Sequence, residues 1–232
     1  MPSTTKPITI FQNTTTRANA LLDLYDRGVD LDEADDLLRA AVVLAVAGFD
    51  RYFTSKFCDV LVPHLKGDDR ISQEVLDLLR RAGLDTKFAL ELAVSKRPFR
   101  KIRTIVQNSM SRHTTQRASV IDKLFNSFGL SELSANAQRK ARRANLLTRI
   151  SRLVDMRNDI AHEAHNNTRG TPKAIDLADI RSRISDMCIF VNSCWRAPIV
   201  WSGLIVSASW AFGPLERYFL VLVADSPRRC AA

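Results

Sequence analysis

The segment that most constrains the fold is an apolar stretch that follows the acidic residues Asp30–Asp36 and continues to Phe57. The carboxylates at its start complement the dipole of a helix. Apolar side chains then recur at helical spacing, at Leu37, Leu38, Ala41, Val42, Leu44, Ala45, Phe49, Tyr52, Phe53 and Phe57. The centre, Ala40–Gly48, is apolar nearly all round, so we expect a helix in the middle of a bundle or buried against a partner. It is too short, and too closely flanked by charge, to span a membrane.

The rest of the chain also favours an all-α fold. Glycine and proline occur only eight times each, and aromatic residues make up 7% of the chain, a composition that disfavours sheets. Spacing and breakers predict further helices at Thr16–Gly28, Ser72–Ala82, Thr86–Val94, Pro98–Ser109, Ala118–Phe128, Ala135–Ala164 and Asp176–Trp195.

We expect two parts in the chain. The first is a helical domain at residues 1–197 that begins with a threonine-rich, flexible arm at residues 1–15. The second is an apolar segment and tail at residues 198–232, in which Ile199–Ala211 alone has β character. For Pro198–Phe212 we favour a buried terminal helix or strand over a membrane-associated segment.

The net charge and the cysteine spacing indicate which classes of partner and cofactor to expect. The net charge is +9 and the pI about 9.8, which favours an anionic partner such as nucleic acid; the alternative is a cationic surface that only keeps the protein soluble. None of the four cysteines has a CxxC partner, so we expect no metal site and no cofactor, and buried free thiols at Cys58 and Cys188. Without a secretory signal, we expect a cytoplasmic protein.

The motif that carries chemistry is Arg157-Asn158-Asp159-Ile160-Ala161-His162. A histidine moves protons near neutral pH, and an arginine holds the charge that builds on a phosphate in a transition state. On a regular helix Arg157 and His162 point about 140° apart, whereas Asn158 and His162 share a face. The alternative is an arginine and a histidine that serve only the helix end. The sequence His162–His165 is spaced wrongly for a zinc protease.

A second candidate feature is a ridge of cations along the helix expected at Ala135–Ala164. We expect phosphate contacts from Arg139, Lys140, Arg142, Arg143, Arg149 and Arg152. The alternative is a solvated helix face.

The motif resembles the R-x4-6-H signature of HEPN domains, including the polar residue after the arginine. The upstream helix Asp35–Tyr52 is similar to the long early helix of the RiboL-PSP-type HEPN branch, and the order of helices fits over roughly residues 15 to 195. The resemblance implies a HEPN-like helical bundle with a long early helix and the signature on the penultimate helix. It also implies a homodimer in which two signature helices meet at a cleft.

The same resemblance implies a metal-independent endoribonuclease of a toxin–antitoxin or phage-defence system. Arg157, His162 and Asn158 would be its catalytic residues, and the products would be 2′,3′-cyclic phosphate and 5′-hydroxyl ends. RNA would be the substrate, and an antitoxin or defence-system protein would be a further partner. The alternative is a non-catalytic HEPN-like module that binds nucleic acid or protein, as an antitoxin or scaffold subunit.

Overall fold

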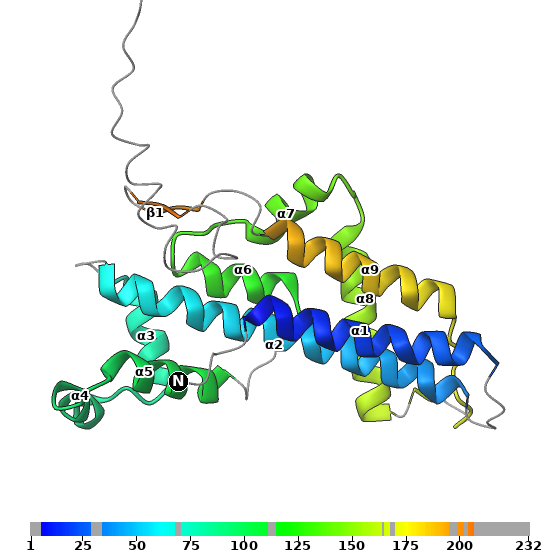
Figure 1. The fold of residues 1–232 in the computed structure, drawn as a ribbon, viewed down its shortest axis with the longest axis horizontal. Coiled ribbons are helices and arrows are strands. Elements are labelled where there is room, and N and C mark those ends of the chain that lie inside the picture. Colours follow the sequence, from blue (N-terminus) through cyan, green and yellow to red (C-terminus); the bar gives the residue numbers. More distant parts are fainter. Residues whose placement is uncertain are drawn as a thin grey trace, which may run out of the picture. The chain divides into compact units, whose positions relative to one another are not determined.

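The computed structural model describes residues 6–28, 34–67, 71–110, 115–163, 165–167, 170–194, 199–201 and 204–206 (Figure 1). These residues form nine helices: α1 (Pro7–Asp26), α2 (Asp35–Gly67), α3 (Gln73–Arg81), α4 (Thr86–Ala93), α5 (Pro98–Met110), α6 (Ala118–Asn126), α7 (Leu133–Ala141), α8 (Leu146–Glu163) and α9 (Leu177–Cys194). The chain divides into two units between Ser193 and Cys194. The expected all-α fold is confirmed, with the signature on the penultimate of these helices.

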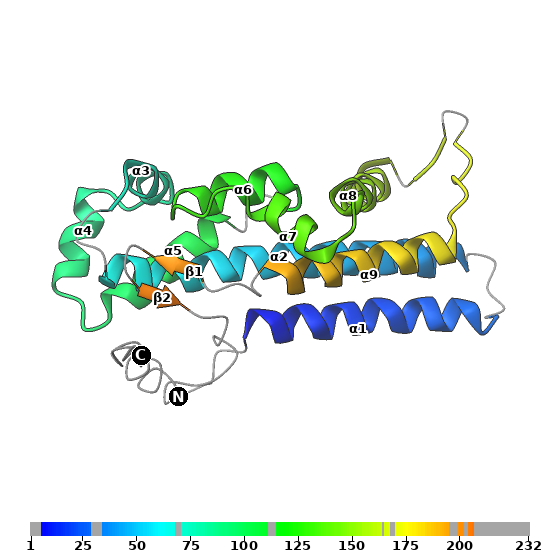
Figure 2. The same cartoon turned by 90° about the horizontal axis from the view of Figure 1, so that it is seen from above.

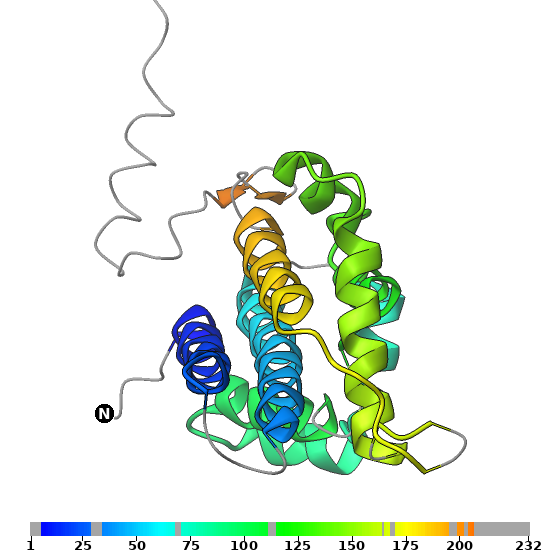
Figure 3. The same cartoon turned by 90° about the vertical axis from the view of Figure 1, so that its right-hand side faces the viewer.

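The long helix α2 is the centre of the first unit, as its all-round apolarity predicts. It contacts α1, α5, α6 and α8. Helices α1 and α8 lie on opposite sides of it, and α8 crosses it (Figures 2 and 3). Three of its rings, Phe49, Phe53 and Phe57, form an aromatic core with Phe125, Phe128 and Phe190, at ring-centroid separations of 4.9 to 6.4 Å. Rings in such tilted and edge-on pairs add to the free energy of burying their apolar surface.

The first helix corrects the expectation of a flexible arm at residues 1–15. Helix α1 begins at Pro7, nine residues before the expected start, and buries Phe11 and Thr15 from within that arm. Its threonine hydroxyls bond back to the helix: Thr15 Oγ1 donates to the Phe11 carbonyl at 3.1 Å. Because these hydroxyls are satisfied locally, Thr14 and Thr15 can lie inside a helix, although such back-bonding adds no stability to it. Residues 1–5 lie outside the described part.

Helix α1 also covers the apolar centre of α2. Ala41, Val42, Ala45 and Val46 are fully buried within this single chain. These four side chains therefore need no partner to be buried, and Thr14 of α1 lies against Gly48 at the end of this stretch.

The long helix expected at Ala135–Ala164 is in fact two. Helix α7 ends at Ala141, Arg142 adopts a left-handed conformation with φ of 53°, and α8 begins at Leu146. The break places Arg143 against the buried carboxylate of Asp186 in α9. Ionic contact with a distant helix thus ends a helix that local spacing would continue. The helices expected at Ser72–Ala82, Thr86–Val94, Pro98–Ser109, Ala118–Phe128 and Asp176–Trp195 are confirmed, with ends that differ by at most two residues.

In the second unit, β1 (Ile199–Trp201) pairs antiparallel with β2 (Leu204–Val206), with Val200 opposite Ile205. The β character expected within Ile199–Ala211 is confirmed for these strands, and the rest of residues 198–232 lies outside the described part. Among the described helices, none combines the length and the apolarity needed to cross a membrane.

Candidate functional site

The signature lies in the last two turns of α8. The helix is regular from Leu146 to Glu163, so the angular argument from the sequence holds: Asn158 and His162 share a face, and Arg157 points about 140° away from His162. His162 is exposed, whereas Arg157 and Asn158 are half-buried. Among the described residues, no hydrogen bond joins His162 to either of the other two. One chain therefore brings Arg157 and Asn158 together but leaves His162 apart.

Arg157 has a buried donor that is unused among the described residues. Its Nη1 donates to Asn158 Oδ1 at 3.1 Å. Its Nε is buried and has no hydrogen-bond partner within the described part of the chain. A buried donor without an acceptor is costly, and the usual reasons to keep one are strain or function. The side-chain amide of Asn158 also holds the guanidinium of Arg157 at the helix surface.

A set of contacts outside the signature holds the end of α8, and we call it the clasp: Arg39, Asp159, His165 and Lys173. The amide of His165 donates to the Asp159 carbonyl at 3.1 Å, and the amide of Lys173 donates to the His165 carbonyl at 2.8 Å. The ammonium of Lys173 lies 3.2 Å from Asp159 Oδ2. Arg39 Nη2 donates to the Lys173 carbonyl at 3.1 Å. The clasp thus ties the signature to the first turns of α2.

His165 lies inside the clasp in an unusual state. It is buried, its φ is 56°, and its Nδ1 finds no hydrogen-bond partner among the described residues. Burial lowers its pKa below the ordinary value, as do the charges of Arg39 and Lys173, while Asp159 acts in the opposite direction. Sequence reasoning considered His165 only as part of a rejected zinc pattern. The one sequence feature that could have indicated this site was Arg39, a charged residue within an apolar helix.

The six cations expected to bind RNA do not form one ridge, because they lie on two helices and the turn between them. Arg143 binds Asp186 Oδ1, and Arg149 Nε binds Asp186 Oδ2 at 2.5 Å. The side chain of Asp186 is 1% exposed, and this contact raises the pKa of Arg149 further. Arg139 contacts Glu132 at 3.3 Å. Lys140, Arg142 and Arg152 are exposed and have no ion pair within the described part of the chain. Their RNA contacts stay a prediction.

The sequence profile of the RiboL-PSP-HEPN family matches residues 12–194. The chain belongs to the RiboL-PSP-HEPN family. The match spans α1 to α9, and so includes the long helix, the signature and the clasp. Comparisons with curated protein sequences and with solved structures each found no match.

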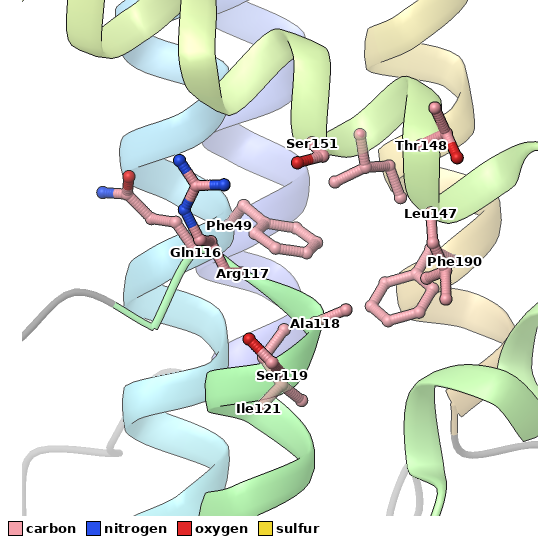
Figure 4. A pocket seen from close by; sticks show the side chains of 11 residues that line it. Phe49, Gln116, Arg117, Ala118, Ser119, Ile121, Leu147, Thr148, Ser151 and Phe190 are labelled. Atoms are coloured by element: carbon pink, nitrogen blue, oxygen red, sulfur yellow. The ribbon is translucent and has the colours of Figure 1, made fainter.

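The HEPN unit also holds a cavity of about 290 Å³ between α2, α6, α8 and α9 (Figure 4). Phe49 and Phe190 line it together with Leu147 and Ile121, and the polar side chains of Arg117, Ser119, Thr148 and Ser151 also border it. Arg117 makes an ion pair of 2.6 Å with Asp155 on α8. The cavity borders the first two turns of α8, whereas the signature lies in its last two. It contains no signature residue.

The expectation of buried free thiols is confirmed for Cys58 and holds only in part for Cys188. Cys58 is a buried free thiol, and burial raises its pKa to about 11, so it stays protonated at neutral pH. Cys188 is free but only half-buried. Within the described residues, no three His, Cys, Asp or Glu side chains are grouped as a metal site requires.

Proposed function

We propose that this HEPN protein is a metal-independent endoribonuclease that acts as a toxin or effector of a toxin–antitoxin or phage-defence system in the cytoplasm. The observation that carries the proposal is Arg157, whose buried Nε has no partner in the described part of the chain and whose Nη1 is fixed by Asn158. A guanidinium held in this way suits a phosphate oxygen, because planar N–H donors match its geometry.

In the proposed reaction the 2′-hydroxyl of the RNA attacks the adjacent phosphorus. His162 takes the hydroxyl proton as general base, and a protonated histidine gives a proton to the departing 5′-oxygen. Arg157 stabilises the charge on the pentacoordinate phosphorane, and Asn158 positions Arg157. The P–O5′ bond breaks as the P–O2′ bond forms, giving a 2′,3′-cyclic phosphate and a 5′-hydroxyl.

The divergence of Arg157 and His162 on α8 supports a composite site in a homodimer. A two-fold axis beside the last turns of α8 would present two copies of each residue to one cleft. One histidine would then act as base and the other as acid. An antitoxin or another defence-system protein would restrain the activity.

Cleavage assays on the wild type, two signature variants and one control variant test the proposal. Wild-type protein is expected to cut RNA in excess EDTA, to leave cyclic-phosphate ends, and to spare DNA, which lacks the 2′-hydroxyl. Arg157→Ala and His162→Ala are each expected to lower the rate on the order of 10²–10⁴-fold. Arg27→Ala, an exposed arginine of the α1 end, is the matched control. Activity that EDTA abolishes and a divalent ion restores would overturn the mechanism.

The second candidate is a non-catalytic HEPN module that binds nucleic acid or protein as an antitoxin or scaffold subunit. Exposure of His162, without an orienting hydrogen bond among the described residues, favours this reading. It is the better account if the pure protein binds RNA, leaves it intact, and keeps its affinity after His162→Ala.

A further inference from the structure

The described part of the chain has a second cationic surface, far from the signature in sequence. Residues 96–103 contain five cations, Lys96, Arg97, Arg100, Lys101 and Arg103, and no carboxylate. Arg103 is used inside the fold, 2.5 Å from Asp59 of α2. Among the described residues, no ion pair joins Arg97, Arg100 or Lys101 to a carboxylate, and all three are exposed. The free cations are therefore available to a ligand.

These three cations line a groove between α4 and α5. Its volume is about 500 Å³, within the range of small-ligand sites. Phe88 contributes an aromatic ring, and Ser95 and Thr104 contribute hydroxyls. Glu91 is the one carboxylate in the lining. Cations that follow a groove, with an aromatic ring among them, are the features with which proteins hold a single-stranded nucleic acid: the cations contact phosphates and the ring stacks on a base.

We propose that the α4–α5 groove binds a single-stranded segment of RNA outside the cleavage site. The inference rests on the proposed function in that it takes RNA as the ligand. Charge favours this ligand, because three unpaired cations face one carboxylate. The exposed apolar side chains of Leu90 in α4 and of Val94 just after it, which a docking peptide helix would use, do not line the groove.

The groove and the signature are both held on α2. Helices α5 and α8 both contact α2, and Figure 1 shows α5 and the last turns of α8 on the same side of it. Arg103 fixes α5 near the end of α2, while Arg39 fixes the clasp near its start.

Binding is measured with a fluorescein-labelled oligouridine in the His162→Ala protein, so that cleavage does not interfere. Arg97→Gln with Arg100→Gln is expected to weaken binding at least tenfold at low salt. Two lost phosphate contacts should also reduce the slope of log K against log salt by about 1.4, at about 0.7 per contact on a single strand. Arg17→Gln with Arg27→Gln removes the same charge from exposed positions of the α1 region and should leave the slope unchanged.

Two further variants distinguish the loss of contacts in the groove from the loss of the fold as the cause of weaker binding. Glu91→Gln removes the repelling carboxylate and should raise affinity a few-fold, which no unfolding does. Phe88→Leu keeps an apolar side chain but removes the stacking face, and should weaken binding about fivefold or more. Circular dichroism melts check that each variant stays folded.

The outcomes separate this inference from the proposed function. Groove-dependent binding by a protein that never cleaves RNA would keep the groove and reject the nuclease. Equal affinity and equal salt slope in the groove pair and its control would reject the groove, whether or not the wild type cleaves. Unchanged RNA binding, together with groove-dependent binding of an acidic amphipathic peptide, would also reject it, in favour of a protein surface.

Discussion

The buried carboxylate of Asp186 accounts for two arginines that the sequence suggested for RNA. Arg143 and Arg149 both bind it, although each guanidinium keeps one side toward solvent. A buried charge is stable only when it is paired and hydrogen-bonded, so these contacts are first a condition of folding. Any phosphate that they bind must compete with Asp186.

Arg149→Gln is therefore expected to lower the free energy of unfolding by about 1.5–3 kcal/mol, the usual range for hydrogen bonds to charged groups. Urea unfolding measures this change. Arg152→Gln, on an exposed position one turn away, should change stability by less than about 0.5 kcal/mol. If Arg149→Gln unfolds like the wild type while RNA affinity falls, the arginine serves the ligand instead.

His165 makes stability depend on pH. Its pKa in the folded protein lies below the ordinary value, so the unfolded chain takes up a proton at a higher pH than the folded one does. The folded state is thus fully stable above the unfolded pKa of about 6.5, and loses stability as pH falls below it. Asn tolerates the left-handed backbone and does not titrate, so His165→Asn removes this dependence.

Thermal melts of wild type and His165→Asn at pH 7.5 and 5.5 measure the difference. The melting temperature of the wild type is expected to fall more between pH 7.5 and pH 5.5 than that of the variant. Parallel losses in the two proteins would show that His165 is not buried in its neutral form.

Among the described helices, α1 and α2 make the most extensive contact. A Cβ at Gly48 would lie 2.9 Å from Thr14 Cβ and from Thr14 Cγ2. The two backbones approach this closely only because Gly48 has no side chain.

Gly48→Ala is expected to lower the free energy of unfolding by about 1–3 kcal/mol, since overpacking outweighs the gain of about 1 kcal/mol from helix propensity. Gly67→Ala, at the end of the same helix, meets nothing within 4 Å and should cost nothing. Denaturant unfolding compares the two. Equal stability of both variants would mean that α1 shifts to admit the methyl group at no cost.

The helices that could be predicted from the sequence are those with a strong local signal. Glycine and proline breakers placed α3 to α6, and apolar spacing placed α2, because neighbours in sequence decide these features. The start of α1 and the break before α8 could not be placed, because Phe11 of α1 packs on Tyr52 of α2 and Arg143 is bound by Asp186 on α9.

For the site, the sequence supplied the signature and its angular divergence. The clasp was not predictable, since Arg39 and Lys173 are 134 residues apart in the chain. The sequence also could not separate the cations that are paired with a carboxylate from those that are free, because only the fold shows which arginines contact a carboxylate.

At the scale of the whole molecule, the composite site predicts complementation. We expect a mixed dimer of a His162→Ala subunit and an Arg157→Ala subunit to regain part of the activity that each homodimer lacks, because one intact copy of each residue faces the cleft. It should stay below the wild type, because it has one histidine where the proposed reaction uses two. Light scattering checks that the dimer forms. A mixed dimer that forms but stays inactive, or a monomer that cleaves at full rate at micromolar concentration, contradicts the composite site.

The clasp also has a consequence for synthesis. Helices α1 and α2 are adjacent in the chain and can pair early, since local contacts need little loop closure. The end of α8 becomes fixed only when Lys173 reaches Arg39, and the aromatic core closes only when Phe190 meets Phe49. A nascent chain must therefore be made past Lys173 before the clasp can hold the signature, and almost to the end of α9 before the aromatic core closes. Under the proposed function, a ribonuclease with this order of assembly leaves its own message uncut while the ribosome is still reading it.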